Sequence, residues 1–235
     1  MSFDFAQLVF LLVAVTTGMT YLTLATVVRR RGFDKLYHRL WAAFCLVGAL
    51  HIITLPLSTV VGDPVAGEAV IRFSMALSCV VLSLFVWFSL AFTGLSSGKR
   101  LLGWSFVFFA IALATSLVAG DRVVAGVAGS EFSRYAPVAG PMMPVFLPFN
   151  AIAWLGPAIV LCRSRKKSRG HERTQLSYML LATVFGLVGT SGYLLPGTLK
   201  SPSLIAFLPA AFLPLFPLTI TYAIVRHRLW GIRTI

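Results

Sequence analysis

The chain has 235 residues, of which 58% are hydrophobic and only 11% are charged. A soluble domain carries roughly 25% charged residues, so this composition excludes an ordinary soluble enzyme and predicts a protein whose solvent is the lipid bilayer. The net charge of +13 comes from short basic runs between apolar segments, which favours topology signals and anionic-lipid contacts over nucleic-acid binding.

Seven apolar segments follow one another along the chain, and each has about the length that a helix needs to cross the hydrocarbon. They lie at 7–28, 40–61, 69–94, 101–119, 142–162, 176–196 and 204–225. We therefore expect an all-α fold: one domain over residues 1–235, forming a bundle of seven transmembrane helices. The longest connection, 120–140, could carry a short interfacial helix.

Basic residues are distributed unevenly between the two sides of this bundle. Sixteen of the 20 Lys and Arg follow the first, third, fifth and seventh segments. Positive charge marks the cytoplasmic side, so we expect the N-terminus outside and the C-terminus in the cytoplasm. The first seven residues hold no Lys or Arg, so the first segment is expected to be a retained helix rather than a cleaved signal. We therefore expect a multi-pass membrane protein.

Ionisable residues are scarce within the expected spans. None of the spans holds an Asp or Glu, which argues against ion-coupled transport. His51 lies near mid-membrane, either as part of a ligand site or as a neutral imidazole bonded to a neighbouring helix. Arg72, at the outer end of the third helix, could bind an anionic ligand, pair with Asp63 or Glu68, or extend to the lipid headgroups.

The fifth helix combines a polar side chain with two prolines. Asn150 lies between Pro148 and Pro157, and each proline frees a backbone carbonyl that needs another donor. Such helices often line a cavity, although a tolerated kink without a ligand would look the same. The candidate ligand-binding residues, which would suit an outward-facing pocket, are His51, Arg72, Asn150, Trp154 and Tyr193.

Signals for catalysis or metal binding are weak. The run Gly189-Thr190-Ser191-Gly192 fits the GxSG pattern of rhomboid proteases, but no later span holds a His to activate Ser191. The glycine spacing favours a small-residue packing face instead. The seventh segment lacks the lysine of a retinal protein, and no HExxH or CxxC motif occurs. We therefore predict no catalytic residue, no metal, no cofactor and, with all three cysteines in apolar segments, no disulfide framework.

Two motifs carry a family resemblance. The third helix ends in WFSLAFTG at 87–94, and the seventh ends in YAIVRHRLWGI at 222–232. Both resemble the N-terminal seven-transmembrane region of prokaryotic histidine kinases, which typically ends in a similar Tyr-Ala-Ile, basic, Leu run before its cytoplasmic output. One departure is Gly231, where that family often has Asp. No phosphoacceptor histidine box or ATP-binding domain follows in this sequence, so we expect either a piece of a longer signalling protein or a stand-alone relative.

The resemblance implies a sensor without catalytic activity of its own, which relays an outer or intramembrane stimulus to a cytoplasmic partner through the seventh helix. The residues expected to transmit it are Pro209, Pro214, Pro217, Tyr222, Arg226, His227 and Arg228. Expected partners are the bilayer, anionic lipids at its cytoplasmic face, a kinase or response partner, and a second copy in a homodimer. The alternatives are a small-molecule transporter, an intramembrane enzyme using Ser191 or His51, and an accessory subunit of a membrane complex.

Overall fold

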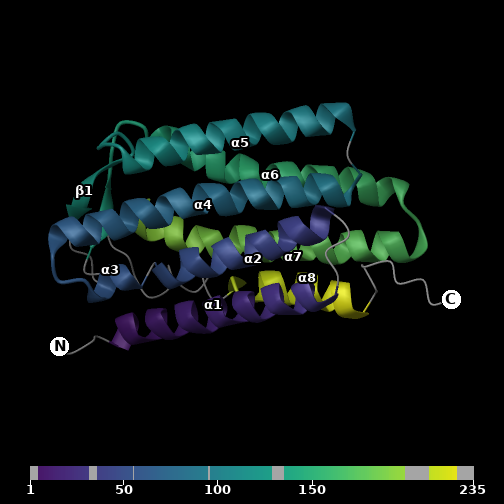
Figure 1. Ribbon diagram of the computed structural model, residues 1–235, viewed down its shortest axis with the longest axis horizontal. Helices are drawn as coiled ribbons and strands as arrows, with labels where there is room; N and C mark the ends of the chain where they lie inside the picture. The colour runs from purple at the N-terminus through teal and green to yellow at the C-terminus, as the bar shows by residue number, and fades with distance from the viewer. Residues whose placement is uncertain are drawn as a thin grey trace.

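The structure is a bundle of long helices that run roughly along one axis (Figure 1). It is a computed structural model that describes residues 5–31, 36–54, 56–94, 96–128, 135–198 and 212–226. The helices are α1 (Phe5–Arg31), α2 (Leu36–Thr54), α3 (Leu57–Val60), α4 (Pro64–Phe92), α5 (Ser97–Val118), α6 (Met143–Lys167), α7 (Gly170–Thr198) and α8 (Leu215–Arg226). The expected helical architecture is thereby confirmed.

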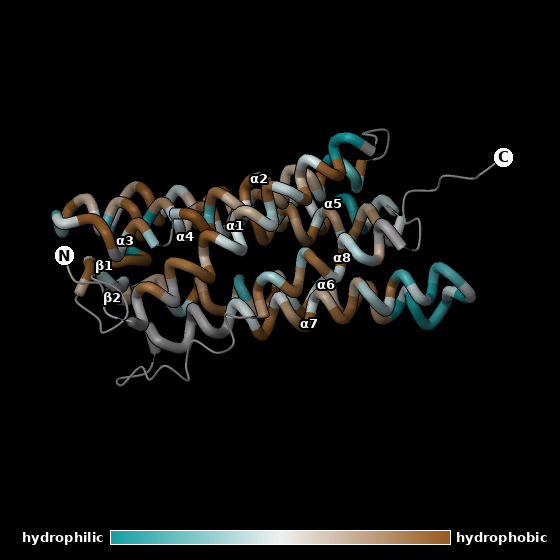
Figure 2. Tube along the Cα trace, turned by 90° about the horizontal axis from the view of Figure 1, so that it is seen from below, coloured by the Kyte–Doolittle hydropathy of each residue, from teal (hydrophilic) through white to brown (hydrophobic). Residues whose placement is uncertain are grey.

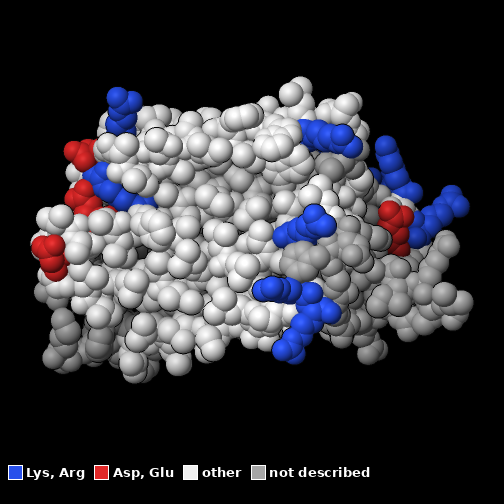
Figure 3. Space-filling view, in the orientation of Figure 1, with Lys and Arg blue, Asp and Glu red and all other residues white. Residues whose placement is uncertain are grey.

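Five described helices are long and apolar enough to cross a membrane: α1, α2, α4, α5 and α6. On the face seen in Figure 3, charged side chains gather toward the two ends of the bundle and leave an uncharged belt between them. Apolar residues likewise dominate the middle of the long helices in Figure 2. The expected spans at 176–196 and 204–225 overlap α7 and α8.

The bundle has two unlike ends. We call the end with the start of α4 and the strands β1 (Val124–Ala128) and β2 (Ala136–Ala139) the hairpin end. The opposite end, where α4 stops and α5 starts, is the basic end. There α6 and α7 continue past the neighbouring helices (Figures 1 and 2), joined by a turn at Gly170 with φ +56°.

Where the structure describes the connection at 120–140, it differs from the expected short interfacial helix. Its described part forms an antiparallel hairpin, in which Val124 lies opposite Ala139 and Ala128 opposite Ala136. The physical reason is that the β-branched residues Val124, Val127 and Val138 favour strands, while Val123 and Val124 gain complete burial. A helix would have turned some of these side chains away from the bundle.

The segment at 40–61 is not one continuous helix. α2 ends at Thr54 and a separate short helix, α3, begins at Leu57. Between them stands Pro56, which has no N–H to donate and crowds the helical conformation of the residue before it. The expected helix is therefore interrupted where its only proline occurs.

Local hydrogen bonds fix both ends of α4. The Asp63 side chain accepts a bond of 3.0 Å from the Ala66 N–H at the first turn, as an N-cap residue does. At the other end, Gly94 has φ +81°, and the Lys99 ammonium donates to the carbonyls of Thr93 and Gly94 at 3.1 and 2.9 Å. A cation at a helix C-terminus is favourable.

An aromatic cluster fills the middle of the bundle. Its rings come from four helices and are Trp41 and Phe44 of α2, Phe85 and Phe88 of α4, Trp154 of α6 and Phe216 of α8. Phe216 has no exposed surface, and its ring centroid lies 5.3 Å from that of Phe85 and 5.4 Å from that of Trp154. The last described helix is thereby anchored by one side chain to three others.

Candidate functional site

His51 faces α4 rather than a cluster of other titratable groups. Its Nδ1 lies 3.2 Å from the Ser74 hydroxyl of α4, and the side chain is half-buried near the end of α2. This geometry matches the simpler of the two expectations, an imidazole that hydrogen-bonds to a neighbouring helix. Such bonds between spans hold helices in register.

Arg72 is the centre of the polar contacts at the hairpin end. Its guanidinium lies 2.5 Å from both the Glu68 and the Asp121 carboxylates, and it also donates to the Gly120 carbonyl. The side chain is about 10% exposed, so it joins the loop before β1 firmly to α4. Of the two expected partners only Glu68 is found, since Asp63 caps α4 instead.

A second contact seats the hairpin on the bundle. The Tyr135 hydroxyl donates a bond of 2.8 Å to the Gly62 carbonyl, across 73 residues of chain. Its ring lies directly against Gly67 of α4, where an added Cβ would come within 2.7 Å of Tyr135 Cε2. Only glycine, which has no Cβ, permits this approach. The hairpin therefore packs closely against the start of α4.

Asn150 and Trp154 share the core face of α6, one turn apart, and both are more than nine-tenths buried. The Trp154 ring packs on Phe85 and against Gly186 of α7, and its indole N–H has no hydrogen-bond partner among the described residues. Tyr193 belongs to α7, but its side chain lies outside the described residues. Whether these residues form one ligand pocket with His51 therefore stays a prediction.

The expected transmission residues lie at or near α8. Pro214 precedes it, Pro217 is buried within it, and the Tyr222 ring stands 5.5 Å from that of Tyr178 on α7. Arg226 is the last residue of α8. Pro209, His227 and Arg228 lie outside the described residues. The aromatic anchor Phe216 was missed by sequence reasoning, because its ring partners come from three other helices, α2, α4 and α6.

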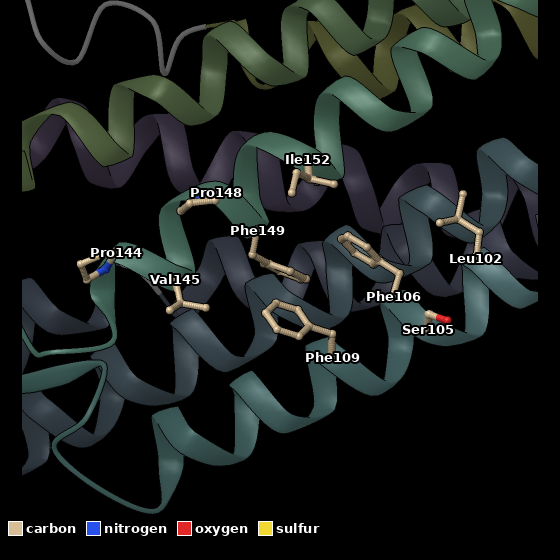
Figure 4. A pocket seen from close by; sticks show the side chains of 9 residues that line it. All are labelled: Leu102, Ser105, Phe106, Phe109, Pro144, Val145, Pro148, Phe149 and Ile152. Carbon is tan, nitrogen blue, oxygen red and sulfur yellow. The ribbon is translucent and has the colours of Figure 1, made fainter.

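A feature that the sequence did not indicate is a groove of about 490 Å³ between α5 and α6 (Figure 4). Its floor is made by Phe106 of α5 and Phe149 of α6, whose stacked rings have centroids 4.8 Å apart. Phe109 extends this floor, with its ring 5.7 Å from that of Phe149. Pro148 and Ile152 line the α6 side. The groove depends on how two helices meet, so no local motif predicts it.

The described residues hold no group of three or more His, Cys, Asp and Glu side chains that could bind a metal. Two glycines of the expected packing face are closely packed: Gly186, before the GxSG run, faces Trp154, and an added Cβ at Gly189, its first residue, would lie 2.7 Å from Leu213 Cγ. The Ser191 side chain is outside the described residues.

Long apolar helices with charges at their ends, gathered round a buried aromatic cluster, define a multi-pass helical membrane protein. A family model described as the N-terminal 7TM region of histidine kinase matches residues 8–233. The chain therefore belongs to this family, and the match spans the sensor region and not a catalytic kinase domain. No curated protein and no solved structure matches the chain.

Proposed function

We propose that this chain is the input module of a membrane sensor, which detects a stimulus in or beside the bilayer and passes it to a cytoplasmic partner. It would cross a prokaryotic cell (inner) membrane seven times, with its hairpin end outside and its basic end in the cytoplasm. Family membership supports the role, and the bias of Lys and Arg toward one side supports the orientation.

The observation that carries this proposal is the position of Phe216. It lies on α8, the last described helix before the C-terminus, and packs against rings of α2, α4 and α6. A displacement of any of these helices changes the surroundings of that one side chain. Because packed cores are bistable rather than continuously deformable, such a change would favour one of two positions of α8.

Signalling then requires that the stimulus bind the two packings with different affinity. Pro214 stands just before α8 and Pro217 lies in its first turn, so the regular backbone hydrogen bonds of α8 begin at this point, with the Leu218 N–H donating to the Pro214 carbonyl. The partners we propose on the cytoplasmic side are a kinase or response protein, a second copy of the chain, and anionic lipid. The exposed basic turn between α6 and α7 suits the lipid contact.

The test joins the chain through Ile235 to a histidine kinase catalytic region and measures autophosphorylation in membrane vesicles. Phe216→Ala leaves a cavity worth about 3–5 kcal/mol in a core, and we expect it to move basal phosphorylation clearly up or down. Leu218→Ala is the matched control, since Leu218 lies on the same helix and is 46% exposed. Equal phosphorylation in both variants and the parent would end the proposal.

A further inference from the structure

The groove between α5 and α6 lies on the side of α6 that faces away from the aromatic cluster. Phe149 turns into the groove, while Asn150 and Trp154 turn into the core. α5 borders the groove as a peripheral helix, and many of its large apolar side chains are more than half exposed, among them Trp104, Phe108 and Ile111. The groove therefore opens in a surface that hydrocarbon must cover (Figure 4).

The lining excludes a polar occupant. Ser105 contributes a hydroxyl to the lining of the groove, and this hydroxyl already donates a hydrogen bond of 3.0 Å to the Leu101 carbonyl of its own helix. The other lining side chains are aliphatic, aromatic or proline. A charged or strongly hydrogen-bonding ligand would lose its water here and gain no partner in return, which costs several kcal/mol in hydrocarbon.

The shape favours a single flexible chain over a helix. Spans pack closely where small residues let two backbones approach, whereas bulky rings of Phe106, Phe109 and Phe149 form this floor. From Leu102 to Phe109 the α5 wall rises about 10 Å at 1.5 Å per residue, which fits within one leaflet of a hydrocarbon core about 30 Å thick. The groove thus has the width and length for part of one alkyl chain.

We propose that an alkyl chain of a bilayer lipid occupies this groove and that its presence sets the position of α6. An occupant bears on Phe149 and Ile152, and the same turns of α6 carry Trp154, whose ring contacts Phe216 of α8. Pro148 stands at the groove and Pro157 just beyond it, so α6 can bend where the occupant presses. The binding of the alkyl chain does not depend on the proposed function, whereas its link to α8 rests on that function.

The experiment reconstitutes the chain in vesicles of phosphatidylcholine that include a phosphatidylcholine with a diazirine near the end of one acyl chain. After illumination, mass spectrometry maps the labelled residues. We expect the α6 peptide with Val145 and Ile152 to be labelled several-fold more than the α1 peptide with Leu12 and Met19, which are 66% and 59% exposed. The α1 peptide represents ordinary contact with lipid.

Two matched substitutions locate the label. Ile152→Trp fills the groove, whereas Ile111→Trp adds the same bulk to α5 outside it, and the two isoleucines are similarly exposed at 59% and 56%. We expect the first to reduce labelling of Val145 several-fold and the second to leave it unchanged. Unchanged labelling of the α1 peptide shows that each variant is folded. If Ile152→Trp fails this check, Val145→Phe takes its place as the substitution that fills the groove, and labelling is then measured at Ile152.

Two results would overturn the proposal. Equal labelling of the α1 and α6 peptides in the parent chain would make the groove ordinary lipid-facing surface. Poor labelling of the groove, together with a dimer that Ile152→Trp dissociates, would make a second copy of the chain the occupant. Neither result involves an output domain, so failure here is distinct from failure of the Phe216 test.

Discussion

The two ends of the bundle are held by different kinds of contact. At the hairpin end, bonds join residues far apart in sequence: Arg72 reaches Asp121 and Tyr135 reaches Gly62, across 49 and 73 residues. At the basic end, bonds are local: Lys99 binds carbonyls five and six residues away, and Arg165 binds Ser177 twelve residues away. Side-chain hydrogen bonds thus join distant parts of the chain at the hairpin end, while at the basic end the bonds of Lys99 and Arg165 join neighbouring turns and most of the Lys and Arg side chains are exposed.

The largest expected difference between the ends comes from Arg72→Gln. It leaves two carboxylates and the Gly120 carbonyl without their cation. Breaking a fully buried pair costs about 3–5 kcal/mol; because Asp121 is 80% exposed, we expect about 2–3 kcal/mol here. The measurement is unfolding of the detergent-solubilised chain. Arg122→Gln, an exposed position in the same loop, should change the free energy of unfolding little, and equal losses would contradict the comparison.

Two glycine-to-alanine substitutions, one at each end of the bundle, are expected to change the free energy of unfolding in opposite directions. Gly67→Ala pushes a Cβ into the Tyr135 ring, and overpacking of this kind costs about 1–3 kcal/mol. Gly98→Ala, at the basic end, meets nothing within 4 Å and should stabilise by about 0.5–1 kcal/mol, since glycine is unfavourable in helices. The same unfolding measurement checks both, and a destabilising Gly98→Ala would show that the basic end is more closely packed than described.

A smaller effect is expected from Lys99→Met. The variant keeps the apolar length of the side chain but loses the ammonium that bonds the end of α4. We expect a loss of about 0.3–1 kcal/mol, the usual value for a cation at a helix C-terminus. Hydrogen exchange at the last turn of α4 should rise more than the global unfolding free energy falls. Arg100→Met, at the neighbouring exposed position, serves as the control.

The smallest effect is expected from Ser177→Ala. It removes the hydroxyl that accepts a bond of 2.8 Å from the Arg165 guanidinium and frees a partly exposed side chain. We expect no more than about 1 kcal/mol and a local rise in exchange near the α6–α7 turn. A loss larger than that of Arg72→Gln would reverse the assignment of the two ends.

Local composition was enough to predict the helices but not their interruptions or contacts. Apolar runs of span length predicted helical segments because backbone groups in hydrocarbon must bond internally. The hairpin was not predicted because a connection in which Val is no more frequent than Ala or Gly forms strands only where the end of a bundle buries Val123 and Val124. The break at Pro56 was readable in principle, since proline carries its own signal.

Of the candidate site, the sequence offered Glu68 as one of several possible partners of Arg72, and the structure shows this pair four residues apart on α4. The sequence could not predict Asp121, which comes to Arg72 only through the path of the loop. For the same reason the α5–α6 groove and the role of Phe216 required the arrangement of four helices. Whether His51, Asn150, Trp154 and Tyr193 share a ligand stays a prediction.

The extension of α6 and α7 past their neighbours gives the bundle a lever. From Trp154 to the end of α6 at Lys167 the helix rises about 20 Å at 1.5 Å per residue. Pivoting α6 by about 5° at Trp154 would swing that tip by roughly 2 Å. The Arg165–Ser177 bond would carry α7 along. A small change of packing around Trp154 would thus reach the tip of α6 as a shift wide enough to make or break a hydrogen bond.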